Sequence, residues 1–152
     1  MNKFAAALST GIFLLLAGPA VTLAATFITP SDVVWKDVPS IAGAQQAILQ
    51  GPLNVKAPFT FRVKFPTGWS ELPHSHPVLI EVTVISGTFN LGIGETYDKT
   101  KTHVLPVGSV VILHPGENHF AWVNEPTVIQ VQGVGPFGVK WVDPKHTGEA
   151  PQ

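Results

Sequence analysis

Apolar and polar side chains alternate in short runs along most of this chain. In the clearest run, residues 59–65, four apolar side chains alternate with Thr60, Arg62 and Lys64. A period of two places the apolar side chains on one face of a β-strand, and the sequence contains no long run with the helical period of 3.6. The sequence therefore predicts an all-β protein whose strands each bury one face.

Glycine and proline separate these runs into about eight short strands. Residues 88–93 are expected to return from the Ser86–Gly87 turn as the hairpin partner of residues 78–85. Only residues 43–50 offer a helical turn, and that stretch is alternatively extended. Short strands with closely spaced turns indicate a β-sandwich or barrel. Besides residues 59–65, strands are predicted over residues 78–85, 88–93, 103–107, 109–113, 119–123, 127–132 and 139–142.

The composition argues against two classes of protein. Charged residues make up 12% of the chain and the formal net charge is −1, whereas hydrophobic residues make up 45%. A disordered chain combines low hydrophobicity with high net charge, and a nucleic-acid-binding protein needs a basic surface to meet phosphate groups. We therefore expect a folded protein with no nucleic-acid partner. The sequence contains no cysteine, which excludes a disulfide and a cysteine-linked lipid anchor.

The first 25 residues have the pattern of a secretory signal peptide. Lys3 is the only positive charge before an apolar stretch over residues 5–17, and small residues suitable for cleavage precede Thr26. The apolar stretch is shorter than the roughly 20 residues that a membrane-spanning helix requires, so no stable membrane anchor is expected. We therefore expect a secreted or periplasmic protein with one domain over residues 26–143 and a flexible tail over residues 144–152.

Histidine is the main candidate for chemistry, because six histidines occur in a chain with few charged residues. His74 and His76 are two residues apart, so that both imidazoles point to one face of a strand. His119 begins another predicted strand, and Glu81 follows His76 by five residues. Neutral imidazole binds Fe, Mn, Ni, Cu and Zn, and three imidazoles on one interior face would form a metal site. The alternative is that these histidines are ordinary surface or interior residues, as isolated histidines usually are.

Two segments around these histidines resemble the two motifs of the cupin superfamily. The first, GWSELPHSHPVLIE, covers residues 68–81 and is closed by Gly87. The second, GSVVILHPGENH, covers residues 108–119 and ends on the third histidine. Residues 82–94 and 130–138 also resemble segments of small bacterial cupins, so that the resemblance extends over nearly all of the chain that follows the signal peptide.

The resemblance implies an all-β fold with a single cupin barrel, also described as a double-stranded β-helix or jelly roll. It also implies a divalent transition metal (Fe, Mn, Ni, Cu or Zn) inside the barrel. Three imidazoles and one carboxylate would hold this metal: His74, His76, His119 and Glu81. Hydrogen bonds to the other ring nitrogens should orient the imidazoles, and the candidate side chains for this role are Thr83, Gln130 and Gln132.

The position of Glu81 departs from the first motif. Counted back from Gly87, the glutamate of the motif falls at Ile80, although the spacing from His76 is acceptable. In a regular strand Val82 faces inward and Glu81 faces away, whereas a bulge would turn Glu81 inward. The sequence leaves both alternatives open.

Three functions are considered, of which the first two are implied by the resemblance and the third is an interaction module that pairs with a partner chain. The first is an exported metal-dependent enzyme that oxidises, decarboxylates or isomerises a small oxygen-rich molecule, in the manner of a dioxygenase, decarboxylase or isomerase. The alternative is a non-catalytic cupin that binds or senses a small molecule or a metal after loss of the acidic ligand. A homodimer is also expected, because cupins frequently pair and because Phe120 and Trp122 point outward if His119 points inward.

Overall fold

The computed structural model describes residues 24–145, in which the regular structure consists of strands and two short 3-10 helices. Each strand predicted from the sequence is present with bounds that differ by a few residues, and residues 45–50 are extended. In chain order the elements are η1 (Pro30–Asp32), β1 (Lys36–Asp37), β2 (Gln45–Gln50), β3 (Pro58–Phe65), β4 (Ser70–Ser75), β5 (Ile80–Ser86), β6 (Phe89–Ile93), η2 (Lys99–Lys101), β7 (His103–Leu105), β8 (Val110–Leu113), β9 (His119–Trp122), β10 (Thr127–Val134) and β11 (Lys140–Trp141).

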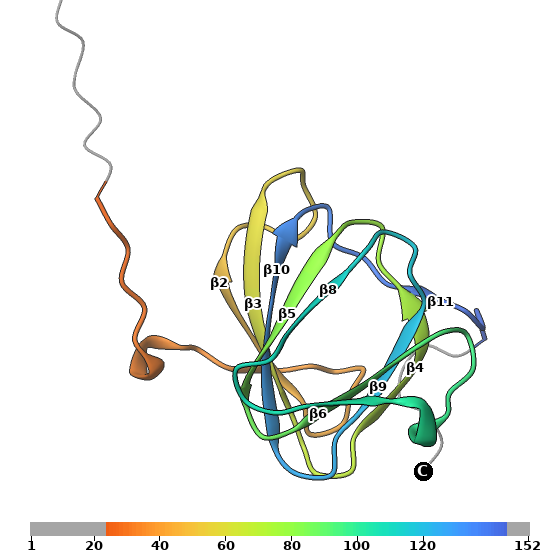
Figure 1. The fold of residues 1–152 in the computed structure, drawn as a ribbon. Helices are drawn as coiled ribbons and strands as arrows, with labels where there is room; N and C mark the ends of the chain where they lie inside the picture. Colours follow the sequence, from red (N-terminus) through yellow and green to blue (C-terminus); the bar gives the residue numbers. More distant parts are fainter. Residues whose placement is uncertain (1–23, 146–152) are drawn as a thin grey trace, which may run out of the picture.

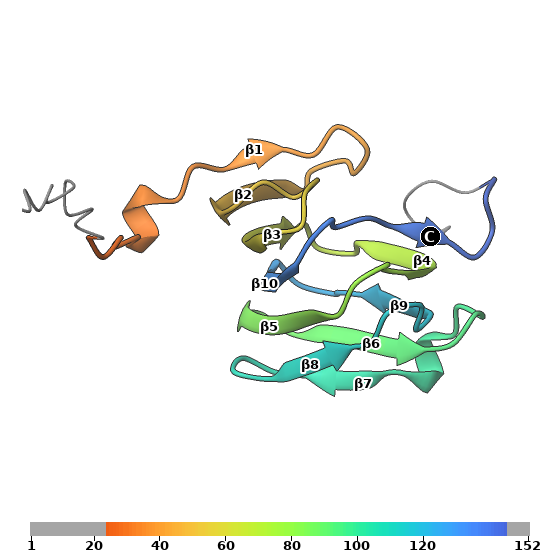
Figure 2. The same cartoon turned by 90° about the horizontal axis from the view of Figure 1, so that it is seen from above.

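The strands form two antiparallel sheets that face each other and enclose an interior (Figure 1). The larger sheet has the order β1-β2-β3-β10-β5-β8, and the smaller sheet has the order β11-β4-β9-β6-β7. Seen from above, the strands of each sheet lie side by side in a row, and the two rows lie next to each other (Figure 2). This arrangement confirms the predicted all-β barrel.

The interior is filled by the apolar side chains that alternate along the strands. On β3, Phe59, Phe61 and Phe65 are 1%, 3% and 4% exposed. The ring of Phe137, from the segment before β11, meets Phe59 and Phe61 edge-on at centroid distances of 5.6 and 5.1 Å. Edge-to-face pairs of this kind add to the hydrophobic stabilisation of the buried rings. Trp69 is also buried in this interior, where it stacks on Phe65.

The predicted hairpin between residues 78–85 and 88–93 is wrong. The strand β5 pairs with β10 and β8 in the larger sheet, whereas β6 pairs with β9 and β7 in the smaller sheet. The turn at Gly87 therefore carries the chain from one sheet to the other. Gly87 has φ +75°, and a Cβ at this position would lie 2.6 Å from the carbonyl oxygen of Pro126. Both the backbone conformation and the lack of space require glycine here.

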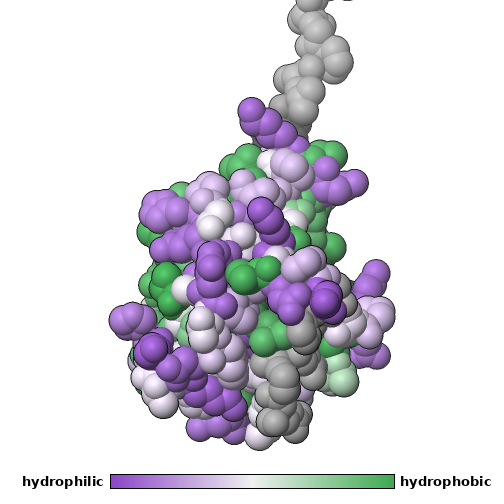
Figure 3. Space-filling model, turned by 90° about the vertical axis from the view of Figure 1, so that its right-hand side faces the viewer, coloured by the Kyte–Doolittle hydropathy of each residue, from purple (hydrophilic) through white to green (hydrophobic). Residues whose placement is uncertain are grey.

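The chain also crosses between the sheets after β10, on the side of the barrel next to β4. In Figure 2 the segment after β10 leads from the larger sheet to β11, which pairs with β4. On this segment the N–H of Phe137 donates to the carbonyl oxygen of Leu53 over 2.7 Å. The outer face around β11 and β4 is mainly hydrophilic, with apolar side chains in small separate patches (Figure 3). Within residues 24–145 no helix is long and apolar enough to cross a membrane.

Candidate metal centre

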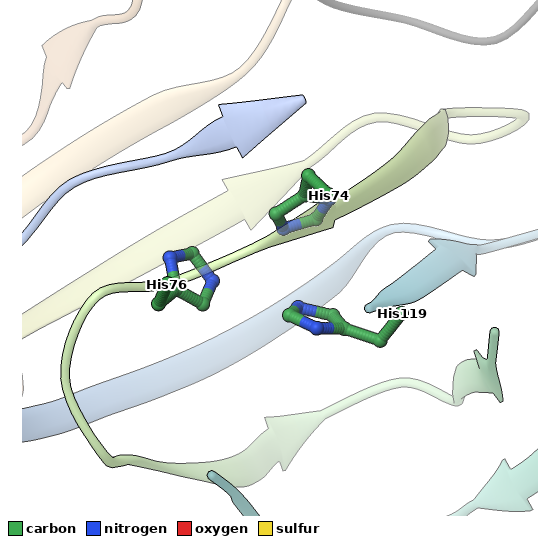
Figure 4. Close-up of side chains that lie close together, drawn as sticks. All are labelled: His74, His76 and His119. Atoms are coloured by element: carbon green, nitrogen blue, oxygen red, sulfur yellow. The ribbon is translucent and has the colours of Figure 1, made fainter. Parts of the chain in front are cut away.

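The three histidines of the two motifs come together inside the barrel. His74 lies on β4, His76 follows the end of that strand, and His119 begins β9. The strands β4 and β9 pair so that His74 is directly opposite His119. Figure 4 shows the three rings converging on one point between the strands. The i, i+2 spacing and the strand pairing thus place all three imidazoles on the inner face.

The distances suit a single metal ion. One ring nitrogen from each histidine can be chosen so that all three lie within 4.8 Å of one another. The ring centroid of His74 is 4.3 Å from that of His119 and 5.0 Å from that of His76, and the His76–His119 centroid distance is 5.1 Å. The three residues are 2%, 6% and 4% exposed in the order His74, His76, His119. The cluster is therefore buried and close enough for three nitrogens to share one ion.

Each histidine has its Nδ1 atom hydrogen-bonded to a backbone carbonyl oxygen. The partners are Leu72 for His74 (2.9 Å), Gly138 for His76 (2.7 Å) and Glu117 for His119 (3.0 Å). A carbonyl oxygen only accepts, so each Nδ1 carries the proton and each Nε2 presents its lone pair. This tautomer leaves the Nε2 atom of each ring free to bind a metal ion.

The side chains predicted to orient the imidazoles do not do so. Gln132 lies on the outer face of β10 and its Nε2 donates to Glu81 over 2.8 Å. Gln130, on the same face, accepts from the Nε of Arg62 over 3.1 Å. The prediction was wrong because the strand directs its inner positions, Ile129 and Val131, into the barrel. Backbone oxygens fill the orienting role instead.

Burial lowers the pKa of all three imidazoles. The pKa of His76 falls to about 4 and that of His119 to about 3, and the pKa of His74 is also lowered. Desolvation is the largest cause in each case, and repulsion from His74 contributes for His76 and His119. The hydrogen bonds to the carbonyl oxygens act in the opposite direction. The rings are therefore neutral at pH 7, which is the form that coordinates metal.

The structure does not bring Glu81 to this cluster. Along β5 the inward positions are Ile80, Val82 and Val84, which are 2%, 4% and 2% exposed. Glu81 lies between them on the outer face, where it accepts the hydrogen bond from Gln132. The irregularity in the pairing of β5 with β10 falls after Val84 and therefore does not turn Glu81 inward.

A different carboxylate, that of Glu71, lies beside the histidines. Its Oε2 is 3.7 Å from the Nε2 of His74, and its side chain is 21% exposed. Burial raises the pKa of Glu71 to about 8, so that in the metal-free protein the group carries its proton at pH 7. Glu71 is not one of the three residues whose ligand atoms meet within 4.8 Å. It stands next to the cluster as a neutral acid.

A β-bulge explains why Glu71 and His74 share a face although they are three residues apart. Glu71 pairs with Ala121 and His74 pairs with His119, so β4 has one more residue than β9 between these two pairs. Such an extra residue reverses the alternation of the strand. The sequence contained a signal for this bulge, since Pro73 lies within β4 and proline inside a paired strand marks an edge or a bulge.

Two cavities meet at the histidine cluster. An outer cleft of about 560 Å³ lies along the segment of β11 and includes Glu95, Asn118 and Lys140. An inner chamber of about 320 Å³ lies between the sheets and includes Glu71 and His119. His76 and Val139 line both cavities, so the cluster stands between the surface and the barrel interior. A molecule bound at the cluster can therefore extend in either direction.

The residues present fit a divalent transition metal. Three neutral imidazoles with free Nε2 atoms form a set of borderline ligands that suits Fe, Mn, Ni, Cu and Zn alike. The hydrogen bonds at Nδ1 fix the orientation of the rings, and in this orientation one nitrogen of each ring lies within 4.8 Å of the other two. Three protein ligands leave coordination positions for water or a substrate, as in catalytic rather than structural metal sites.

The fold is that of the cupin class of double-stranded β-helix proteins, which confirms the fold that the resemblance in the sequence implied. An RmlC-like cupin from Shewanella frigidimarina is 15% identical, with a TM-score of 0.59 over 73% of this chain and 91% of its own. The polyketide cyclase RemF from Streptomyces resistomycificus is 20% identical, with a TM-score of 0.63 over 79% of this chain and 87% of its own. The model of the family described as "Domain of unknown function (DUF4437)" matches residues 26–149, and the chain belongs to this family.

Two further comparisons complete this picture. A proposed acetylacetone dioxygenase from Methylibium petroleiphilum is 14% identical, with a TM-score of 0.62 over 85% of this chain and 88% of its own. No curated protein sequence matches the chain. At these identities the likeness to solved structures shows the shared fold, and the function has to be argued from the site.

Proposed function

We propose that this protein binds a divalent transition metal through the Nε2 atoms of His74, His76 and His119 and acts on a small molecule that chelates the metal. The observation that carries the proposal is the common state of the three rings, each neutral, buried and held by a backbone carbonyl oxygen at Nδ1. Packing of the core alone would not be expected to direct three free ring nitrogens to one point, whereas a metal site requires this arrangement.

A metal at this position would supply Lewis acidity, or dioxygen chemistry if the ion is iron. The protein contributes the arrangement around it. The three imidazoles stay neutral and fixed, the apolar interior excludes water, and the Glu71 carboxyl group faces the inner chamber at the edge of the cluster. Glu71 is therefore the group placed to exchange a proton with a bound molecule.

The solved structures support small-molecule chemistry in this fold. They include a polyketide cyclase and a proposed acetylacetone dioxygenase, both of which have names that refer to oxygen-bearing carbon compounds. The outward direction of Glu81 favours a second candidate function, a non-catalytic cupin that binds a metal or a small molecule. Turnover of a ligand distinguishes the two, and oxygen uptake with catechols, flavonols and thiols is the first assay.

The metal site is tested by the metal content of protein purified without an affinity tag. Mass spectrometry of the wild type should give close to one Fe, Mn, Ni, Cu or Zn per chain, and His76→Ala should lose it. The matched control is His103→Ala, since His103 is an exposed histidine on β7 outside the cluster. Wild-type protein that contains no metal and takes up none of these ions would refute the proposal.

We also propose that the protein is exported and that residues 1–25 are removed. The support is the charge and apolar pattern of this segment, most of which lies outside the described residues. The intact mass of protein recovered from a periplasmic or culture fraction should correspond to a chain that begins at Thr26. A full-length mass, or retention in the cytoplasm, would contradict export.

A further inference from the structure

We propose that the inner chamber selects a ligand with a compact apolar body and a single oxygen-bearing end that meets the metal. The inference rests on the proposed metal site, because the oxygen-bearing end is the part that reaches it. It narrows the substrate class from oxygen-rich molecules in general to molecules whose oxygens are confined to one end. Sugars and polyols are thereby excluded.

The lining of the chamber carries this inference. All but five of its lining residues are aliphatic or aromatic. The apolar lining comes from both sheets and includes Phe61, Val82, Leu91, Leu113 and Val131. The five polar residues are Ser40, Gln46, Glu71, His76 and His119.

The polar groups lie on three segments only. Glu71 and His76 come from β4 and the residue after it, His119 comes from β9, and Ser40 and Gln46 come from the chain around the start of β2. The inward faces of β5, β6, β8 and β10 contribute no polar side chain to the chamber. A ligand whose oxygens lie at the cluster therefore has its body against apolar side chains.

The volume sets the size of that body. The chamber has about 320 Å³, which is roughly twice the 150 Å³ of an apolar protein cavity that binds benzene. A substituted single ring or a branched aliphatic group of similar size fills it. The apolar walls offer few hydrogen-bond partners to water, and a ligand that fills the chamber gains contact with the surrounding side chains.

Hydroxyl groups on the part of the ligand that lies against β5, β6, β8 and β10 would find no side-chain partner in the chamber. A buried hydroxyl without a hydrogen bond weakens binding by about ten-fold or more. The effect multiplies with each hydroxyl, so a polyol is rejected even when its chelating end is correct. The chamber thus rejects ligands with hydroxyl groups on the body because its apolar walls offer no hydrogen-bond partner, and the oxygen-bearing end of the ligand binds at the histidine cluster.

The test compares two catechols that share the chelating head and the carbon skeleton. These are 4-ethylcatechol and 3,4-dihydroxyphenylglycol, which differ by two hydroxyl groups on the side chain. Zn(II)-loaded protein is titrated with each in a calorimeter, because zinc does not oxidise catechols. We expect 4-ethylcatechol to bind about a hundred-fold more tightly, since each of the two unpaired hydroxyl groups weakens binding about ten-fold.

Two variants on β10 show whether the chamber is responsible. Val131→Phe places a larger side chain in the chamber and should abolish binding of 4-ethylcatechol, with one zinc still bound per chain. Val128→Phe is the matched control, because Val128 lies on the outer face of the same strand. Where Val131→Phe fails to fold, Val131→Thr keeps the shape, adds a hydroxyl to the chamber and should reduce the preference between the two catechols.

The outcomes separate this inference from the proposed function. If zinc binds but the two catechols bind equally, or if the variants at 128 and 131 behave alike, the inference is overturned and the metal site stands. If the wild type binds no metal, the proposed function fails. The chamber is then tested in the metal-free protein with ethylbenzene by NMR, where the absence of shifts at Leu91 and Val131 overturns the inference as well.

Discussion

Replacing Glu71 by glutamine should stabilise the metal-free protein, and increasingly so as the pH rises. Burial raises the pKa of the Glu71 carboxyl from 4.5 to about 8. Between these values the folded protein holds a proton that the unfolded chain has released, so the free energy of unfolding of the wild type falls with increasing pH. Glutamine has nearly the same shape and remains neutral at every pH, which removes this dependence.

The magnitude follows from the size of the pKa shift. Each pKa unit corresponds to about 1.4 kcal/mol, so the loss in the wild type amounts to about 3 kcal/mol at pH 7 and about 5 kcal/mol above pH 8. The side chain of Glu71 is 21% exposed, and contact with water makes these figures upper limits. A loss of this size is a large part of the 5–15 kcal/mol by which a domain of this length is ordinarily stable.

The assay is urea unfolding of wild type and Glu71→Gln, followed by fluorescence from pH 4.5 to 9 in the presence of a chelator. The histidines are the same in both proteins, so their titration cancels in the difference between the two unfolding free energies. That difference should rise by up to about 1.4 kcal/mol per pH unit and level off above pH 8. Glu125→Gln, at an exposed turn position, is the control and should give a constant difference. A difference for Glu71→Gln that does not change with pH would refute the reasoning.

Three other predictions concern the histidines, the outer glutamate and the turn between the sheets. The metal-free protein should lose stability as the pH falls from 6.5 towards 4, because the histidines take up protons in the unfolded chain but stay neutral in the folded protein. Circular dichroism should show a less steep acid transition for His76→Ala than for the wild type. Glu81→Gln should leave the zinc affinity within about two-fold of wild type in a competition titration, since the carboxylate faces away from the cluster; a loss of more than ten-fold would show that it reaches the metal. Gly87→Ala should destabilise the protein by about 1–3 kcal/mol in urea and more than Gly68→Ala, because both glycines have positive φ but only Gly87 lacks space for a Cβ; equal losses would contradict this.

The fold was predictable because its strands alternate cleanly. The run from Phe59 to Phe65 has one apolar face, and it forms β3 with that face inside. Which strands pair with one another was harder to predict from the sequence. A glycine turn such as that at Gly87 is equally suited to a hairpin and to a crossing between two sheets, so the sequence around it does not distinguish the two arrangements. Only the pairing with β10 and β8 decides it, and this depends on residues far along the chain.

Within the site, the three histidines could be predicted from their spacing in the sequence, whereas the position of Glu71 beside them could not. His74 and His76 share a face by the period of a strand, and the second motif supplied His119. In a regular strand Glu71 would face away from His74, so its position beside the cluster depends on a bulge in β4. The alternation of apolar and polar residues does not predict this bulge. The backbone partners of the imidazoles leave no trace in the sequence, since every residue has a carbonyl oxygen.

The use of carbonyl oxygens to hold the imidazoles bears on how this site responds to mutation over evolutionary time. Substitutions at Leu72, Glu117 and Gly138 leave in place the backbone oxygen that accepts the hydrogen bond. A saturation mutagenesis experiment read out by metal retention should therefore show little tolerance at the three histidines and broad tolerance at Leu72 and Glu117. Sequence variation at these supporting positions would then give no evidence that the site is lost. If conservation at these positions were used to recognise the site in an alignment of the family, the number of metal-binding members would be underestimated.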